Sequence, residues 1–366
     1  MALSVVLAGG GTGGHVYPAL ALAETIRKRE PEARVRFLGT ERGIETRVVR
    51  RAGYSLDHVP ARPVRGTSPI ARGRALLSLA AGFLAARRLL RSAGPDLVIG
   101  TGGYASVPAV LAALSLGVPV GLIEPNAIPG RANRWLARFV RCVFVQFQAA
   151  LDRLPRGRAA LTGIPVRPLP LRTPRETRGE TGTVRLLVIG GSQGAHSINR
   201  AMCGALEQLG ERDGFRITHQ TGEADLADVR AAYAEAGVEA EISAFFDDMM
   251  ERLSRAHLVL ARAGASTIAE LCIAGVASIL VPYPHAADDH QAANAEALEQ
   301  TGACRLLDDR QLERGLAPLV RSLARDPEGL RRMGDAALRL AAPDAAERIW
   351  DVCTGWLPAT RASERR

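Results

Sequence analysis

The chain has 366 residues, which is long for a single hydrophobic core and favours two domains of ordinary size. Hydrophobic residues make up 47% and charged residues 23%, as in soluble globular proteins, and no run of 18 apolar residues predicts a membrane-spanning helix. The net charge of +9 admits nucleic acid, an anionic membrane or a phosphorylated substrate as a partner, but the 4% of aromatic residues argues against base-stacking surfaces. The start of the chain lacks the features of a signal peptide, so we expect a cytoplasmic protein.

The five cysteines are scattered along the chain and form no CxxC pair. Because thiols stay reduced in the cytosol, we expect neither a disulfide nor a metal site, but small buried side chains. These residues are Cys142, Cys203, Cys272, Cys304 and Cys353.

The first part of the chain alternates short apolar runs with helical patterns. A helix is predicted over Val16–Arg29, and further helical patterns separate the later apolar runs. The predicted strands are Leu3–Ala8, Val35–Leu38, Leu97–Ile99, Val118–Ile123 and Cys142–Val145. Strands that are apolar throughout and alternate with helices indicate a parallel sheet covered on both faces.

A proline-rich stretch, residues 164–183, breaks this rhythm and is predicted to be a linker. The strands predicted after it are Val184–Ile189, Phe215–His219, Glu239–Ser243, His257–Leu260, Ser278–Val281 and Arg305–Leu307. The tail after Pro343 is predicted to be helical to about Trp356 and to pack back towards the first domain. We therefore expect an α/β fold with two doubly wound parallel-sheet domains. The expected parts are residues 1–163, 164–183, 184–342 and 343–366.

Glycine-rich turns follow several of the predicted strands. The first, Gly9–Gly14, joins a strand to a helix and formally matches the dinucleotide fingerprint GxGxxG. Glycine permits positive φ and lets backbone N–H groups approach a phosphate. The acid that a dinucleotide site needs after the second strand is missing, because Leu38 leads into Gly39-Thr40. The match alone is therefore weak evidence.

Two further turns, Gly100–Tyr104 and Gly190–Gly194, also follow strands. Ligands of α/β sheets bind beyond the carboxyl ends of the strands, so these turns belong to binding faces. Glycine in one such turn can serve backbone geometry alone, but three turns together favour ligand binding.

A fourth candidate turn, Arg262–Glu270, follows another predicted strand. Ser266 and Thr267 fall at a helix start, where hydroxyl and N–H groups can bind phosphate. Glu270 falls one turn into that helix. Its carboxylate could accept two hydrogen bonds from ribose hydroxyls, or it could merely favour the helix dipole, and the spacing leaves both readings open.

Taken together, these elements resemble the MurG family, the bacterial N-acetylglucosaminyltransferases of peptidoglycan synthesis. The GGTGGH, GGY, GGSQG and GASTxxE motifs occur in the family order, joined by Glu124-Pro125-Asn126, Gly163–Arg167 and Pro282–Gln291. The resemblance covers residues 4 to about 345. It implies the GT-B fold, in which two Rossmann-like domains face each other across a cleft. It also implies inverting transfer of GlcNAc from UDP-GlcNAc to the 4-hydroxyl of MurNAc in lipid I (undecaprenyl-pyrophosphoryl-MurNAc-pentapeptide), which forms lipid II.

The resemblance further implies which residues bind the donor. They are Thr12, Gly13, Gly14, Asn126, Arg167, Ser192, Phe246, Ala265, Ser266, Thr267, Ile268, Ala269, Glu270 and Gln291. Phe246 would lie at the uracil, Glu270 would bind the ribose, and Gln291 would contact the sugar with Asn294 nearby.

Two positions depart from the family pattern. Pro125 replaces a glutamine and lacks a backbone N–H, and Ile164 replaces an asparagine and lacks a side-chain amide. Because Asn126 and Arg167 are retained, the activity that the resemblance implies is unchanged.

Inverting transfer needs a base for the acceptor hydroxyl and stabilisation of the departing UDP. His15 is the leading candidate for the base, because it lies at the first glycine turn and imidazole titrates near neutrality. It could instead anchor the turn or bind pyrophosphate, and Glu124 and His290 are the alternative bases. Arg167 and the helix N-termini can neutralise the diphosphate, so we expect no obligatory metal or other cofactor, with a divalent cation at most stimulatory.

A lipid-linked acceptor requires contact with a bilayer, and residues 70–91 form a candidate amphipathic helix. Leu76, Leu79, Phe83 and Leu90 share one stripe suited to the core. A second flank carries Leu77 and Leu84 beside Arg88 and Arg91, as in an interfacial anchor. A core helix with a solvated arginine edge is the alternative.

The family's membrane-facing N-terminal domain favours the anchor. It implies a peripheral protein on the cytoplasmic face of the bacterial inner membrane. The implied partners are UDP-GlcNAc, lipid I, the anionic membrane surface and other proteins of cell-wall synthesis or division, with no nucleic acid.

Three other functions fit parts of the sequence. A GT-B transferase for another lipid or a natural product would share the GASTxxE motif, but GGTGGH and the Asn126 segment distinguish it. A nicotinamide-dependent oxidoreductase is disfavoured by the missing acid and by glycine turns in both halves. The charge permits nucleic-acid binding, but no recognition motif supports it.

Overall fold

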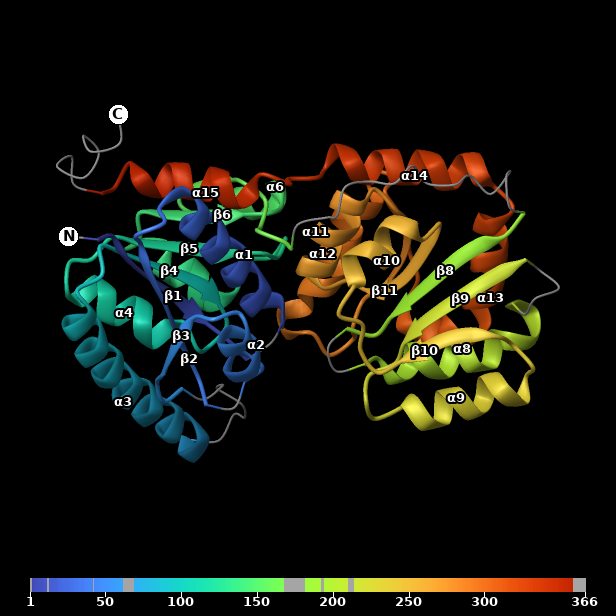
Figure 1. The fold of residues 1–366 in the computed structure, drawn as a ribbon, viewed down its shortest axis with the longest axis horizontal. Helices are drawn as coiled ribbons and strands as arrows, with labels where there is room; N and C mark the ends of the chain where they lie inside the picture. The colour runs from blue at the N-terminus through green and yellow to red at the C-terminus, as the bar shows by residue number, and fades with distance from the viewer. Residues whose placement is uncertain are drawn as a thin grey trace. The chain divides into compact units, whose positions relative to one another are not determined.

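The computed structural model describes residues 2–11, 13–41, 43–61, 69–167, 182–191, 194–209 and 214–357. It divides the chain into two compact units. Unit 1 comprises Met1–Val166 and Pro343–Arg366, and unit 2 comprises Arg167–Ala342. Figure 1 shows that each unit is a twisted sheet with helices on both faces. Most of the predicted linker lies outside the described residues.

Unit 1 contains a seven-stranded parallel sheet in the order β3-β2-β1-β4-β5-β6-β7. Its strands are β1 (Ser4–Gly9), β2 (Arg34–Gly39), β3 (Ser55–His58), β4 (Leu97–Gly102), β5 (Val120–Glu124), β6 (Cys142–Val145) and β7 (Ala159–Leu161). Its helices are α1 (Gly13–Arg29), α2 (Glu45–Arg51), α3 (Pro69–Ala93), α4 (Val107–Ser115), α5 (Arg131–Leu136), α6 (Gln148–Leu151) and α15 (Ala345–Thr354). The strand order reverses between β1 and β4, as at the switch point of a doubly wound sheet.

Unit 2 repeats this plan with a six-stranded parallel sheet in the order β10-β9-β8-β11-β12-β13. Its strands are β8 (Val184–Ile189), β9 (Phe215–Gln220), β10 (Ala240–Ser243), β11 (Leu258–Arg262), β12 (Ala277–Val281) and β13 (Cys304–Leu306). Its α-helices are α8 (His196–Leu209), α9 (Leu226–Glu235), α10 (Met249–Arg255), α11 (Ala265–Ala274), α12 (His290–Glu299), α13 (Leu312–Ala324) and α14 (Pro327–Arg339), and its 3₁₀ turns are η2 (Ala287–Asp289) and η3 (Asp309–Gln311).

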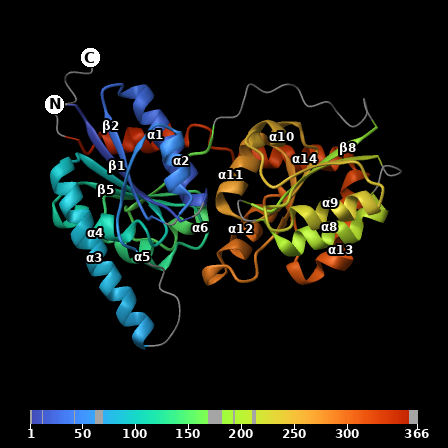
Figure 2. The ribbon, with the colours of Figure 1, turned by 60° about the horizontal axis from the view of Figure 1, so that its bottom comes forward.

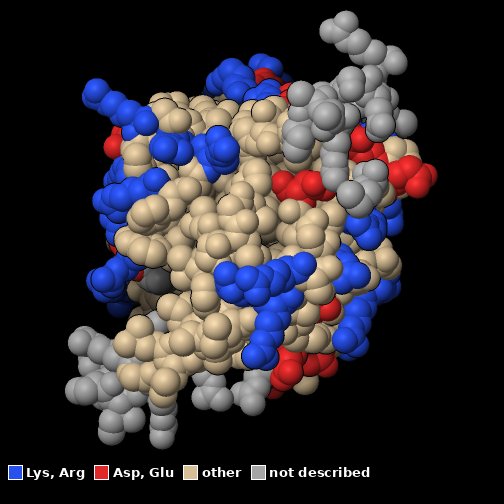
Figure 3. All heavy atoms as spheres, turned by 90° about the vertical axis from the view of Figure 1, so that its left-hand side faces the viewer, with Lys and Arg blue, Asp and Glu red and all other residues tan. Residues whose placement is uncertain are grey.

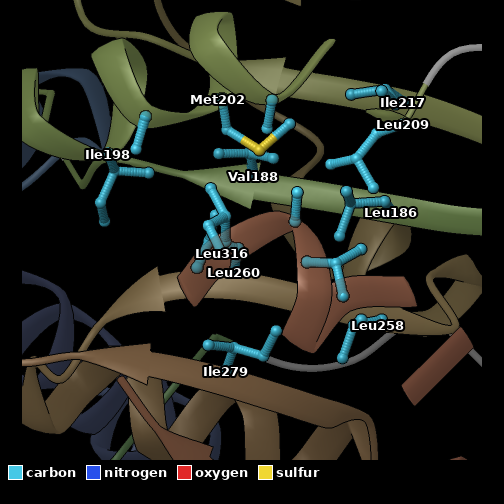
Figure 4. Close-up of a cluster of buried hydrophobic side chains, with 14 of the residues drawn as sticks. Leu186, Val188, Ile198, Met202, Leu209, Ile217, Leu258, Leu260, Ile279 and Leu316 are labelled. Carbon is cyan, nitrogen blue, oxygen red and sulfur yellow. The ribbon is translucent and has the colours of Figure 1, made fainter. Parts of the chain in front are cut away.

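Both cores follow from the alternation of side chains along buried strands. In unit 1, one face of the sheet packs against apolar residues of α3, α4 and α5, and α3 lies beside α4 (Figure 2). In unit 2, Leu186 and Val188 of β8 point to the same face two residues apart and meet Met202 of α8 and Leu316 of α13 (Figure 4). Continuous apolar strands therefore become sheets buried on both sides.

The predicted α/β class with two doubly wound parallel sheets is confirmed. The strands β3 and β7 were not predicted, because each is an edge strand of only four or three residues. One expected core residue was wrong: Leu76 is 66% exposed, because it lies early in α3, whereas Leu90 near the other end is buried. No described helix is long and apolar enough to cross a bilayer.

The C-terminal helix α15 belongs to unit 1 and packs against α1. Trp350 is fully buried, and the ring of Trp356 stacks on Phe144 of β6 with centroids 6.0 Å apart. An ion pair of 2.7 Å joins Arg29 of α1 to Asp351 of α15. Unit 1 is thus completed by a segment that follows unit 2 in the sequence.

Candidate active site

The first two glycine turns lie side by side in unit 1, because β4 pairs with β1 and sets Gly102 opposite Gly9. His15 of α1 packs on the second turn, with Nδ1 3.0 Å from the carbonyl oxygen of Thr101. Both Gly102 and Gly103 have positive φ, and a Cβ on either would lie 2.8 or 3.1 Å from the imidazole. When His15 donates Nδ1–H to Thr101, Nε2 carries the lone pair that a general base needs.

A buried carboxylate that the sequence did not single out holds the first turn. Glu45, the first residue of α2, accepts hydrogen bonds from the N–H of Gly11 at 2.9 Å and from the N–H and hydroxyl of Thr40 at 3.0 and 2.8 Å. An acid therefore does lie beyond β2, but it binds the protein's own turn. Because one turn N–H is already satisfied, this turn offers fewer donors to a phosphate, which agrees with the weakness of the dinucleotide match.

Glu124 closes the loop that follows β5. Its Oε1 accepts hydrogen bonds from the N–H and Nδ2 of Asn126 at 3.0 and 3.1 Å, and its Oε2 accepts from the N–H of Gly130 and Nδ2 of Asn133, both at 2.9 Å. Burial raises the pKa of this carboxyl, and the four hydrogen bonds oppose the rise. With both oxygens occupied and almost no exposed surface, Glu124 is better placed to position Asn126 than to act as the base.

Both departures from the family pattern are accommodated by the structure. Glu124 binds the N–H groups of residues 126 and 130, so Pro125 removes no donor from the set. Ile164 is buried as part of the hydrophobic interior.

In unit 2, a buried polar network supports the turn after β8. Gly194 has a φ of +80°, and a Cβ there would collide with the carbonyl oxygen of Thr221. That oxygen accepts a hydrogen bond from Asn199 Nδ2 at 2.9 Å, and Asn199 Oδ1 lies 3.1 Å from Nε2 of His219. The hydroxyl of Tyr233 lies 3.1 Å from Nδ1 of His219. A neutral imidazole that is protonated on Nε2 satisfies every polar group in this hydrogen-bond network.

The pH dependence of unit 2 stability tests this network. Burial lowers the pKa of His219 from 6.5 to about 4, so between these values the unfolded chain binds the extra proton. We expect the contribution of His219 to the free energy of unfolding of unit 2 to be at its maximum above pH 6.5. It should fall by about 3 kcal/mol as the pH drops towards 4. Hydrogen exchange of β8 and β9 amides between pH 7 and 4.5 measures the loss. His219→Gln should flatten the dependence of unit 2 stability on pH. His285→Gln, which replaces an exposed histidine, should leave this dependence unchanged. The same pH dependence in wild type and His219→Gln would contradict the assignment.

The fourth turn leads from β11 into α11, and β11 pairs with β8, which sets Ala261 opposite Ile189. Glu270 lies on α11, with Oε1 3.2 Å from a guanidinium nitrogen of Arg167. Burial raises the pKa of Glu270 and Arg167 lowers it. The helix dipole acts mainly within the first turn, and Glu270, the sixth residue of α11, lies beyond that turn. Its position therefore favours ribose binding over an interaction with the helix dipole.

Further expected donor-binding residues of unit 2 are placed as follows. Gln291 accepts a hydrogen bond from the N–H of Tyr283 at 2.9 Å, and buried Asn294 donates to the carbonyl of Ala263 at 3.2 Å, which fixes the start of α11. The ring of Phe246 is buried, so only the backbone of this residue could contact the uracil of the donor. The residues Ala265–Ala269 form the first turns of α11.

Five further predicted residues are placed as follows. Gly13 and Gly14 begin α1 beside His15. Thr12 and Ser192 lie outside the described residues. His290 begins α12, after Asp288 and Asp289 in left-handed conformations. No group of three or more metal-ligating side chains occurs within the described ranges.

The predicted membrane residues lie on the outer side of α3. Leu77 and Leu84 are 73% and 56% exposed, and Arg88 and Arg91 are also exposed. Leu76 adds to this apolar surface, which we call the α3 patch. Figure 3 shows one face of unit 1, where lysine and arginine side chains border a broad surface without charge.

Unit 1 carries a second exposed surface that was not predicted from the sequence. A hollow of about 690 Å³ is lined by Arg131, Arg134, Trp135, Arg138, Arg153 and Pro155. Trp135 and Phe139 are each about half exposed, with ring centroids 5.3 Å apart. None of the four arginine side chains forms an ion pair with a carboxylate in the described part of the chain. We call this cationic and aromatic surface the α5 patch; the spacing of arginines around Trp135 was the available signal.

Comparison with known proteins agrees with this arrangement. Residues 5–145 match the glycosyltransferase family 28 N-terminal domain, and residues 185–349 match the glycosyltransferase family 28 C-terminal domain. Two curated UDP-N-acetylglucosamine–N-acetylmuramyl-(pentapeptide) pyrophosphoryl-undecaprenol N-acetylglucosamine transferases are similar over nearly their full length. The one from Myxococcus xanthus is 43% identical and covers 98% of this chain and 94% of its own; the one from Geobacter metallireducens is 44% identical and covers 95% and 97%.

A solved structure gives the same result. The crystal structure of Acinetobacter baumannii MurG superposes with a TM-score of 0.77 at 30% identity, over 96% of this chain and 98% of that one. The two doubly wound units, each with glycine turns beyond its strands, define a glycosyltransferase of the GT-B class. Within that class, the chain belongs to the MurG family of N-acetylglucosamine transferases.

Proposed function

We propose that this protein transfers GlcNAc from UDP-GlcNAc to the 4-hydroxyl of MurNAc in lipid I and so forms lipid II. The observation that carries the proposal is the identity of 43–44% with transferases named for this reaction, over at least 94% of each chain. The reaction inverts the anomeric carbon: the acceptor oxygen bonds to C1, and the bond from C1 to the diphosphate breaks.

Unit 2 is the proposed donor domain. Glu270 is buried enough to act as a strong acceptor for ribose hydroxyls, and the α11 N-terminus offers N–H groups to the diphosphate. Arg167 adds positive charge near the same helix. These groups stabilise the charge that develops on the departing UDP, so the chemistry requires no obligatory metal, and a divalent cation would at most stimulate it.

His15 is the proposed general base. The carbonyl of Thr101 orients its Nδ1–H, and in this tautomer the lone pair of Nε2 would take the proton of the acceptor hydroxyl. Glu124, fully engaged in its own loop, would act through Asn126.

One assay tests the reaction. Purified protein with labelled UDP-GlcNAc and a lipid I analogue should yield the labelled disaccharide, with UDP-glucose and UDP-GalNAc as poor donors. A second arm with a chelator tests whether a divalent cation is needed. Transfer to another lipid or natural product, with none to lipid I, would favour the alternative GT-B function.

The lipid-linked acceptor calls for a membrane contact, and we place it on unit 1 at the cytoplasmic face of the inner membrane. The α3 patch offers exposed leucines beside arginines, and the α5 patch offers interfacial aromatic rings beside four arginines. Helices α3 and α5 cover the same face of the unit 1 sheet. Arginines next to apolar side chains suit an anionic lipid surface.

Vesicle binding measures this contact. Replacing both Leu77 and Leu84 with glutamate should weaken binding to anionic vesicles at least about tenfold, because apolar burial is lost and charge repulsion is added. Leu340→Glu is the matched control, because Leu340 is an exposed leucine of unit 2. Undiminished binding of the double variant, or an equal loss in the control, would refute the α3 patch as the anchor.

A further inference from the structure

Arg252 of α10 forms a clamp at the end of β10. Its two terminal guanidinium nitrogens bind both carboxylate oxygens of Glu241 at 2.6 and 2.8 Å, and its Nε binds Asp248 at 2.8 Å. The guanidinium carbon lies 3.8 Å from the centre of the Phe246 ring. A single side chain thus connects Glu241, which precedes the segment 243–248, to Phe246 and Asp248 within it.

These contacts are of the strong kind. The pair with Glu241 is bidentate, and Arg252 is only 20% exposed, so solvent screens it less than an ordinary surface pair. The hydrogen bonds from Arg252 hold the pKa values of Glu241 and Asp248 below their usual range, which keeps both carboxylates ionised near neutral pH. Arg252 also covers the aromatic ring, which is buried although the neighbouring Phe245 is 43% exposed.

The segment needs such support because β10 is the edge strand of the unit 2 sheet. Beyond β10, the N–H of Gly222 donates to the carbonyl of Ala244, Ser243 and Phe245 form local bonds, and the carbonyl of Asp248 accepts from the first N–H groups of α10. The ring of Phe246 is turned inward, so a ligand base would meet the backbone of this segment. A backbone amide and carbonyl can match the acceptor and donor edge of a pyrimidine only if the segment keeps one conformation.

We propose that Arg252 is a positioning residue for the donor base: by clamping Glu241, Asp248 and the Phe246 ring, it holds the segment 243–248 in the conformation that receives the pyrimidine of the nucleotide. The inference rests on the proposed function for the identity of the donor. It assigns Arg252 no contact with the reacting atoms.

Isothermal titration with UDP and with CDP tests the clamp. For Arg252→Ala we expect the Kd of UDP to rise about tenfold and the preference for UDP over CDP to shrink, while kcat and the KM of lipid I stay within about twofold. Arg252→Lys keeps the charge but loses the bidentate pair, so it should lie between wild type and alanine. Glu241→Gln keeps the contact between Arg252 and the Phe246 ring, so its Kd for UDP should also lie between those of wild type and Arg252→Ala.

The control is Arg331→Ala, which removes an exposed arginine of α14 that pairs with Glu328 and Asp335. It should leave nucleotide binding unchanged. A folded Arg252→Ala variant with a lowered Tm but unchanged Kd for UDP would make the clamp merely structural and overturn the inference. If UDP binding falls as expected but wild type makes no lipid II, the clamp stands and the proposed reaction fails.

Discussion

Replacing Glu270 with glutamine is expected to weaken UDP-GlcNAc binding about 30-fold. Hydrogen bonds to a charged acceptor each contribute about 1.5–3 kcal/mol, and the amide keeps the shape of the side chain but only one acceptor oxygen. A loss of about 2 kcal/mol corresponds to a factor of about 30. Titration with UDP-GlcNAc, and separately with UDP, measures the effect.

The control for this substitution is Glu296→Gln on the exposed face of α12. It changes the same charge in unit 2 without touching α11. Donor affinity that is unchanged in Glu270→Gln would show that Glu270 serves only the helix, and the ribose assignment would fall. Because the ion pair between Arg167 and Glu270 is lost in Glu270→Gln, the thermal stability of this variant should be measured alongside.

A second large effect is expected at Glu45. Replacement by alanine removes the acceptor of the two buried donors of Thr40 and of the part-buried N–H of Gly11, and unmet buried donors cost about 1–3 kcal/mol each. We expect unit 1 to lose about 3 kcal/mol of stability and the transfer rate to fall with it, because the first glycine turn loosens beside His15. All three tryptophans, Trp135, Trp350 and Trp356, lie in unit 1, so their fluorescence follows its unfolding in urea.

Two comparisons make this prediction decisive. Glu41→Ala removes an exposed carboxylate from the same connection and should leave the urea midpoint unchanged. UDP binding, proposed for unit 2, should survive in Glu45→Ala. A midpoint equal to that of Glu41→Ala would mean that the turn does not depend on this carboxylate.

The fold was largely predictable because its signals are local. Continuous apolar strands such as β1, β4 and β8 indicate a buried parallel sheet, and the glycines that follow them indicate turns at its carboxyl edge. The short edge strands β3 and β7 carry too few apolar residues to stand out.

The supporting residues of the site could not be predicted in the same way. Glu45 reaches the first turn from a different element, and nothing in its neighbourhood marks it as buried. The role of Arg252 depends on Glu241 from a separate strand and on the direction in which the Phe246 ring points. Such groups are defined by the folded geometry, whereas Glu270 and His15 belong to motifs that can be read along the chain.

The placement of α15 bears on how the protein is made. Because Trp350 and Trp356 fill unit 1 from the far end of the chain, a ribosome releases the last piece of unit 1 only after all of unit 2 has been synthesised. The first domain to emerge is therefore the last to be finished, and its α1 surface stays uncovered during translation. A chain that ends at residue 342 would contain all of unit 2 but only part of unit 1.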